Sequence, residues 1–202
     1  LGLAATISDP SERAWAYRRL IDALLNDEAM AMPARAGART LFDFADRDEV
    51  ARWRVVVDGV MGGLSSGRIA QEANSLIFSG ETSLRNNGGF SSIRAQVPAG
   101  SLAGYDALRI RVKGDGRTWI IGATARSDMR GDSYWTRFDT VAGEWQTVTV
   151  PITDMVRQYF GQPIRGRLEP SAVRGVEFYI YDKQAGPFRL EVDRIEGVRE
   201  GA

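Results

Sequence analysis

The stretch YDALRIRVK, Tyr105 to Lys113, decides the fold class of this chain. Apolar and charged residues alternate along it, with Leu108, Ile110 and Val112 set between Arg109, Arg111 and Lys113. Successive side chains of a β-strand point to opposite faces of the sheet. The alternation therefore predicts a half-buried strand whose apolar face packs on a core.

The same period of two recurs from Leu41 to the end of the chain. Short segments rich in β-branched and aromatic residues are separated by Gly, Pro, Asp and Ser about every 8–12 residues. These segments are RTWIIGATAR (117–126), SYWTRFDT (133–140), WQTVTVP (145–151), VEFYIYD (176–182) and PFRLEVDRI (187–195). Residues 41–202 are therefore predicted to form an all-β jelly-roll β-sandwich.

The first 40 residues have a different character. In SDPSERAWAYRRLIDALLNDEAM, residues 8–30, Asp9 is a helix cap, Pro10 suits the first helical position and Glu12 completes a capping-box pattern. An amphipathic helix is predicted here, docked on its own domain or bound to a partner. AMPARAGART, residues 31–40, is typical of a linker, so residues 1–40 are predicted to be helix and linker.

Composition excludes several classes of function. The chain of 202 residues has a formal net charge of zero, no histidine and no cysteine. Zero net charge gives no basic field for nucleic acid, and the missing residue types exclude thiolate nucleophiles, Ser-His-Asp triads and Cys-based zinc sites. No apolar run approaches the roughly 20 residues that span a bilayer, so the chain is not predicted to be transmembrane.

No motif in the chain marks catalysis, a cofactor or a metal. KGDGR, residues 113–117, lacks the spacing of a phosphate-binding loop and is predicted to be a turn between two strands. No EF-hand spacing appears among the acidic residues. We therefore expect a protein without enzymatic activity, cofactor or metal site.

Two glycine-rich loops are the candidate binding surface: DGVMGGLSSGR (58–68) and the start of SLRNNGGFSSIRAQV (83–97). A hairpin turn needs two residues of this kind, and each loop has more. Glycine also lets another backbone or a partner approach closely, although packing alone is an alternative explanation. The candidate binding residues are Asp58, Met61, Gly62, Gly63, Asn86, Asn87, Gly88, Gly89, Phe90 and Arg94.

Aromatic residues supply a second candidate surface. Trp119 and Trp145 are predicted to fill the core. Tyr134 and Trp135 are adjacent, so one of them must face outward if they lie in a strand. The candidates for stacking on a sugar ring are Tyr134, Trp135, Tyr179 and Tyr181.

Several segments together closely resemble one known family. In chain order they are LFDF (41–44), VVVDGVMGGLSSGRI (55–69), LIFSGETSLRNNGGFSSIRAQV (76–97), LRIRVKGDGRTW (108–119), EWQTVTVPITDM (144–155) and VRGVEFYIYDKQAGPFRLEVDRI (173–195). From about Leu41 to Val198 the chain is similar to the CIA30 family, the complex I intermediate-associated protein 30 domain. The resemblance implies a galactose-binding-like β-sandwich, a fold shared with carbohydrate-binding modules.

The resemblance also implies a function. Mitochondrial members of the family are chaperone-like assembly factors that hold intermediates of respiratory complex I, and bacterial relatives carry the same domain. We therefore expect a non-enzymatic, protein-binding assembly or scaffolding factor whose partner is a complex I assembly intermediate. A carbohydrate-binding module is the alternative.

The basic residues indicate a bacterial source for the chain. The first residues bear on its cellular compartment. All of the basic residues except Lys113 and Lys183 are arginines, which is typical of a GC-rich bacterial genome. We expect a soluble bacterial protein of the cytoplasm, or of the periplasm if LGLAATI (1–7) is the end of a trimmed signal peptide.

Overall fold

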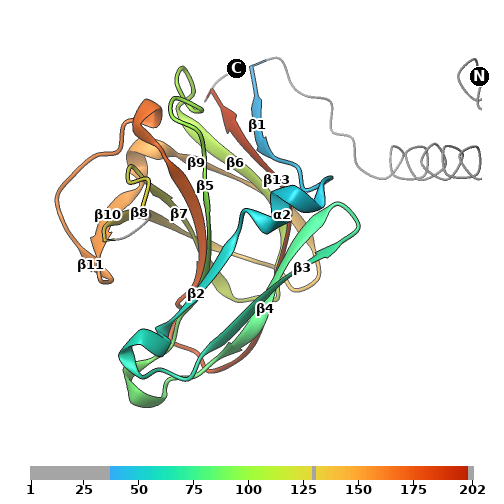
Figure 1. Cartoon of the computed structure of the whole chain (residues 1–202), viewed down its shortest axis with the longest axis vertical. Coiled ribbons are helices and arrows are strands. Elements are labelled where there is room, and N and C mark those ends of the chain that lie inside the picture. The colour runs from blue at the N-terminus through green and yellow to red at the C-terminus, as the bar shows by residue number, and fades with distance from the viewer. Residues whose placement is uncertain (1–36, 129–130, 200–202) are drawn as a thin grey trace, which may run out of the picture. The chain divides into compact units, whose positions relative to one another are not determined.

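The computed structural model describes residues 37–128 and 131–199, without the side chains of Val60 and Met61. Two antiparallel sheets make up this part of the chain (Figure 1). In the six-stranded sheet the order is β3 (Ser66–Glu72), β4 (Ser75–Thr82), β13 (Gly186–Val198), β6 (Ala107–Lys113) and β9 (Trp145–Pro151), and β1 (Arg39–Phe42) also pairs with β13. The predicted all-β sandwich is confirmed, whereas the predicted amino-terminal helix lies outside the described residues.

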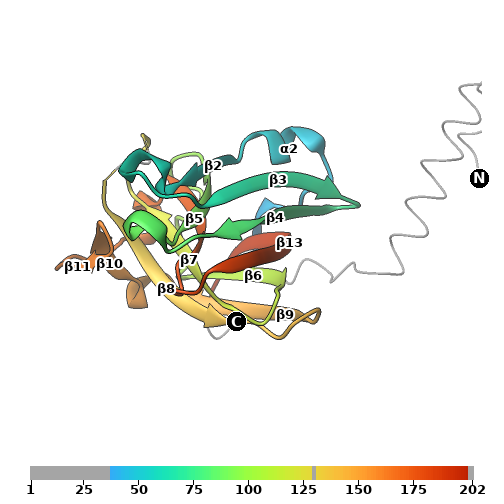
Figure 2. The same ribbon diagram turned by 90° about the horizontal axis from the view of Figure 1, so that it is seen from below.

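The second sheet has seven strands. Their order is β11 (Gln162–Pro163), β10 (Val156–Tyr159), β8 (Ser133–Asp139), β7 (Thr118–Thr124), β12 (Gly175–Ile180), β5 (Ser91–Gln96) and β2 (Arg54–Val57). The short helical elements are α2 (Arg47–Ala51) and the 3-10 turns η1 (Asp58–Met61), η2 (Arg85–Asn87), η3 (Ile152–Asp154) and η4 (Pro170–Ala172). Figure 2 shows the two sheets facing each other across the sandwich.

The apolar side chains at alternate positions along the strands meet between the two sheets. Leu108, Ile110 and Val112 of β6 are fully buried, as the alternation predicts. Trp119 of β7 is also fully buried, with its ring edge-on to Phe78, so its predicted place in the core is confirmed. Removing such side chains from water is the main force that closes the sandwich, at about 1.5–3 kcal/mol for each large apolar side chain.

The charged side chains of β6 lie on the opposite face of the six-stranded sheet. Lys113 Nζ pairs with Glu191 at 2.7 Å, and the Arg111 guanidinium pairs with Asp193 of the neighbouring strand β13. Trp145 lies on this same face, because it is the direct pairing partner of Lys113, and Cζ of the Arg111 guanidinium lies 4.3 Å from the centre of the Trp145 ring. The prediction that Trp145 fills the core is therefore wrong.

Candidate functional site

One buried carboxylate joins the two glycine-rich loops, residues 58–65 and 83–90, which we call the loop pair. Asp58 is only 1% exposed. Its Oδ2 accepts hydrogen bonds from the Ser65 hydroxyl at 2.6 Å and from the backbone N–H groups of Gly89 at 2.7 Å and Phe90 at 3.2 Å. Its Oδ1 accepts the Ser65 N–H at 3.1 Å. The two loops, which lie side by side in Figures 1 and 2, are thus held as one unit.

The glycines of the loop pair make room for this carboxylate. A Cβ at Gly63 would lie 2.2 Å from Asp58 Cγ, and a Cβ at Gly88 would lie 2.6 Å from Asp58 Oδ2. Asn86 adopts the left-handed conformation, with φ of 55°, and its side-chain amide donates to the Gly62 carbonyl at 2.9 Å. Gly63, Gly88 and Asn86 therefore serve internal packing.

The outward surface of the loop pair is apolar at two points. Leu64 is 52% exposed and Leu84 is 46% exposed, one on each loop, and Asn87 is exposed beside Asn86. Candidate residues Asp58, Gly62, Gly63, Asn86, Gly88, Gly89 and Phe90 are brought together here. The sequence interpretation missed Leu64, Ser65 and Leu84, although all three lie within the two glycine-rich stretches, residues 58–68 and 83–97. The Met61 side chain lies outside the described residues.

A row of aromatic rings runs from the loop pair along the outer face of the seven-stranded sheet, the face that points away from the core. Phe90 meets Tyr181 edge-on, with ring centres 6.2 Å apart, and Tyr181 lies 6.4 Å from Trp135. Trp135 in turn packs on Tyr179 at 4.8 Å. These rings come from β8, from β12 and from the residues at the ends of β5 and β12. β12 and β5 are neighbours in the sheet, and β7 lies between β12 and β8.

The four sugar-stacking candidates do not share one surface. Tyr134 points into the core and its hydroxyl donates to the Arg167 carbonyl at 3.1 Å, whereas Trp135 points outward, as two adjacent strand residues must. Tyr179 is on the outer face but buried. Only Trp135 and Tyr181 present part of their rings to solvent.

A buried acid lies under these rings. Glu177 is 1% exposed, accepts a hydrogen bond from the Tyr179 hydroxyl at 2.8 Å, and has Arg94 Nε 3.8 Å from its other oxygen. Burial raises the pKa of Glu177, and the positive charge of Arg94 and the Tyr179 hydroxyl offset only part of that effect. Burial also raises the pKa of Tyr179, so its hydroxyl keeps its proton and remains a donor.

This burial predicts how stability depends on pH at Glu177. Because its pKa is higher in the folded than in the unfolded chain, the folded state loses stability as the pH rises from below the ordinary Glu pKa, about 4.3, through the raised value. Glu177→Gln keeps a neutral side chain at all pH values. The free energy of unfolding of Glu177→Gln relative to the natural chain should therefore rise between pH 4 and 7, by about 1.4 kcal/mol for each unit of pKa difference.

Urea unfolding at several pH values measures this difference. Glu144→Gln, which changes an exposed turn residue, is the matched control and should leave the pH profile unchanged. If the free energy of unfolding changes with pH in the same way for the natural chain and for Glu177→Gln, burial does not favour the neutral form of Glu177.

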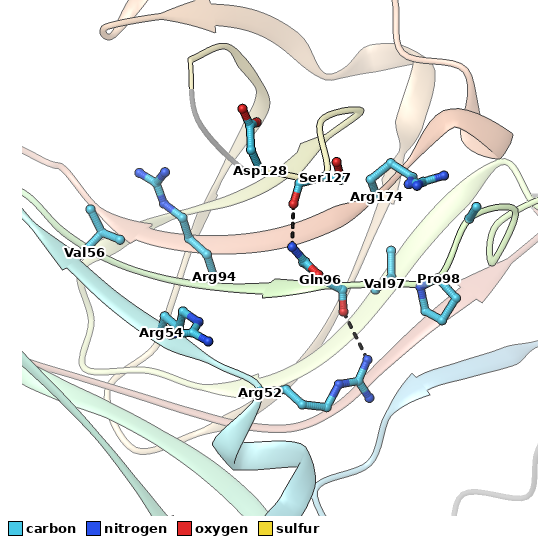
Figure 3. Close-up of a pocket in the computed structure, with 11 residues that line it drawn as sticks. Arg52, Arg54, Val56, Arg94, Gln96, Val97, Pro98, Ser127, Asp128 and Arg174 are labelled. Carbon is cyan, nitrogen blue, oxygen red and sulfur yellow. Dashed lines mark hydrogen bonds between the residues drawn. The ribbon is translucent and has the colours of Figure 1, made fainter.

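A pocket on this sheet lies at the end away from the loop pair. It has a volume of about 950 Å³, and we call it the arginine pocket because Arg52, Arg54, Arg94 and Arg174 line it (Figure 3). Arg94, predicted as part of the loop surface, lies here instead, because its side chain projects from the middle of β5. The other three arginines were missed, since no local pattern connects positions 52, 54 and 174.

Two structural features of the described residues bear on function. Within 37–128 and 131–199, no three or more acidic side chains gather as ligands for a metal ion. No helix in this part of the chain has the length and apolarity to cross a bilayer.

Solved structures with the same fold include carbohydrate-binding modules. A family 11 module from Clostridium thermocellum, in complex with a β-1,3-1,4-mixed-linked tetrasaccharide, has a TM-score of 0.58 and 18% identity, covering 81% of this chain and 96% of the module. The family 11 module of a cellulosomal cellulase of Clostridium thermocellum has a TM-score of 0.60 and 17% identity, covering 81% and 95%. At these identities the likeness concerns the fold, and it confirms the predicted galactose-binding-like β-sandwich.

Sequence comparison adds the family. The mouse mitochondrial protein named complex I intermediate-associated protein 30 is 24% identical over 181 residues, which cover 78% of this chain and 55% of the mouse protein. The chain thus spans about half the length of that relative. The family model of complex I intermediate-associated protein 30 matches residues 42–192, most of the chain. This chain belongs to the CIA30 family.

Proposed function

We propose that this chain is a non-catalytic, protein-binding assembly or scaffolding factor that acts on an intermediate of respiratory complex I. Family membership and the name of the mouse relative support an assembly role. The absence of His and Cys from the whole chain is in keeping with a protein that binds rather than catalyses.

The observation that carries the proposal is the loop pair itself. A buried carboxylate with four hydrogen bonds holds two loops in a fixed arrangement, and that arrangement exposes Leu64 and Leu84. Preorganised loops lose little conformational entropy on binding. Exposed leucines on such loops supply the apolar centre that protein interfaces bury, with Asn87 as part of a polar rim.

Co-purification tests the proposal. Tagged chain is expressed in cells that contain respiratory complex I, and captured complex I subunits are quantified by mass spectrometry. Leu64→Ser/Leu84→Ser should lower capture about tenfold or more, because the apolar centre of the proposed interface is lost. Val141→Ser changes an equally exposed apolar residue of another loop and should leave capture unchanged. Equal capture by the natural chain and the double variant, or no complex I subunits with either, would refute the proposal.

Carbohydrate binding is the second candidate function. The observation that favours it is the pair of partly exposed rings, Trp135 and Tyr181, on the outer face of the seven-stranded sheet. Aromatic faces in shallow grooves are a common element of ligand sites. In a glycan array, binding that disappears with Trp135→Ala would favour this function over protein binding, and an array without signal would exclude it.

A further inference from the structure

The arginine pocket concentrates positive charge in a chain whose net charge is zero. Its lining includes four arginines and a single carboxylate, Asp128. Both Asp128 oxygens accept hydrogen bonds from Arg126, at 3.0 and 2.8 Å, and Arg126 is not among the lining residues. Arg126 therefore matches the charge of Asp128, and the buried Glu177 lies beside Arg94. Arg52, Arg54 and Arg174 still give the pocket an excess of positive charge.

Two of the four guanidinium groups are held in place by the protein. Arg52 donates to the Gln96 carbonyl at 3.1 Å and lies 4.7 Å from the centre of the Phe42 ring. Arg94 lies 5.3 Å from the centre of the Tyr179 ring, beside the buried Glu177. Contacts of this kind limit the rotamers of a long side chain, so less entropy is lost when it binds a ligand.

The other two lining arginines are Arg54 and Arg174. Within residues 37–128 and 131–199, neither Arg54 nor Arg174 pairs with a carboxylate, although Arg174 is half-buried. Arg54 and Arg94 are direct partners across strands β2 and β5, and Figure 3 shows both among the lining residues of the pocket. Guanidinium groups bind carboxylates through paired hydrogen bonds, so this arrangement suits more than one carboxylate.

The rest of the lining points to a peptide. Val56, Val97 and Pro98 place apolar surface between the arginines, and the volume of about 950 Å³ is near the upper end for a small-molecule site. An extended acidic peptide has carboxylates on alternate residues, roughly 7 Å apart on one face, and carries other side chains between them. Such a segment offers carboxylates to several arginines and apolar side chains to the surface among them.

We propose that the arginine pocket binds an acidic, extended peptide segment of the partner protein. The occupant is a protein because the inference rests on the proposed function. The pocket and the loop pair lie at opposite ends of β5, so a partner could contact both, and each surface can be tested by itself.

Fluorescence anisotropy tests the pocket with the full chain. The probe is a labelled peptide that alternates glutamate with alanine, and the reference has glutamine in place of every glutamate. The glutamate peptide should bind at least about tenfold more tightly, and added salt should weaken it, because the attraction is between charges. Equal affinity for the two peptides would overturn the proposal.

Two variants locate the binding. Arg54→Gln/Arg174→Gln should weaken the glutamate peptide about tenfold or more without loss of thermal stability, since neither side chain has a carboxylate partner within the described residues. Arg68→Gln, an exposed arginine of β3 outside the pocket, is the matched control. Unchanged affinity in the double variant would overturn the assignment, as would tighter binding of an anionic polysaccharide than of the peptide at the same arginines.

The two proposals fail in different ways. If complex I subunits are not captured but the glutamate peptide still binds, only the identity of the partner protein is refuted. Loss of peptide discrimination, with capture dependent on Leu64 and Leu84, would refute only the arginine pocket.

Discussion

Asp58→Ala is expected to destabilise the folded chain by about 3–5 kcal/mol. The substitution leaves three backbone N–H groups and the Ser65 hydroxyl without their acceptor in a buried site. Each unsatisfied buried group costs about 1–3 kcal/mol, and water that enters the space recovers part of the total. Urea unfolding followed by tryptophan fluorescence measures the loss.

Companion variants make this result specific. Asp58→Asn keeps one acceptor oxygen but turns an NH₂ group toward N–H donors, so it should also be destabilised. Asp154→Ala, an exposed acid of η3, should change stability by less than about 0.5 kcal/mol. A loss below about 1 kcal/mol for Asp58→Ala would mean that the loops do not depend on the carboxylate.

The pH dependence of Asp58 has the opposite sign to that of Glu177. Burial opposes ionisation of Asp58, but the hydrogen bonds from Ser65, Gly89 and Phe90 outweigh it, so its pKa is lowered. Its contribution to stability is complete above the ordinary Asp pKa of about 3.9 and is lost only as the pH falls through the lower folded value. The difference in the free energy of unfolding between the natural chain and Asp58→Ala should therefore become smaller only in strong acid.

Gly63→Ala is expected to cost about 2–4 kcal/mol. The new Cβ would lie 2.2 Å from Asp58 Cγ and 2.3 Å from its Oδ1, and the short Asp side chain can give way only by breaking its hydrogen bonds. Gly59→Ala, in the same loop, is the matched control, because its Cβ would meet only Val57 Cγ2 at 3.8 Å. Chemical denaturation of both variants gives the comparison.

A double-mutant cycle shows whether the two effects share one cause. In the Asp58→Ala background the carboxylate is gone, so Gly63→Ala should cost much less than it does alone, with a coupling of about 1–3 kcal/mol. Additive costs would show that Gly63 is required for a reason other than the carboxylate. Both single variants should also weaken partner capture, because Leu64 and Leu84 depend on the same loops for their positions.

The fold class could be predicted because it depends on a local pattern. The alternation in Tyr105–Lys113 places Leu108 and its apolar neighbours in the core without knowledge of any partner strand. The same rule places one of Tyr134 and Trp135 outward. Applied to residues 145–151, it also sets Trp145 on the face opposite Val148 and Val150, and the structure places Trp145 beside Lys113 on the outer face. The prediction of Trp145 in the core rests on its aromatic character alone, and the alternation outweighs it.

The candidate site could be predicted only in part. The glycines and asparagines of the loop pair stand out in the sequence, but their cause is a carboxylate hydrogen-bonded to a backbone 31 and 32 residues further along. Closeness in sequence predicts Arg94 on that loop surface. Its side chain belongs to another part of the sheet, since a few residues of extended chain cover more than 10 Å.

By itself, the sequence determined the period of two, hence the sandwich and the inward residues of its strands, and it marked the two unusual loops. Only the tertiary structure decided that Asp58 binds both loops and that Arg52, Arg54, Arg94 and Arg174 surround one pocket. The reason is that strand pairing brings together residues far apart in the chain, such as Arg94 and Glu177, and the residues themselves carry no local signal of that pairing.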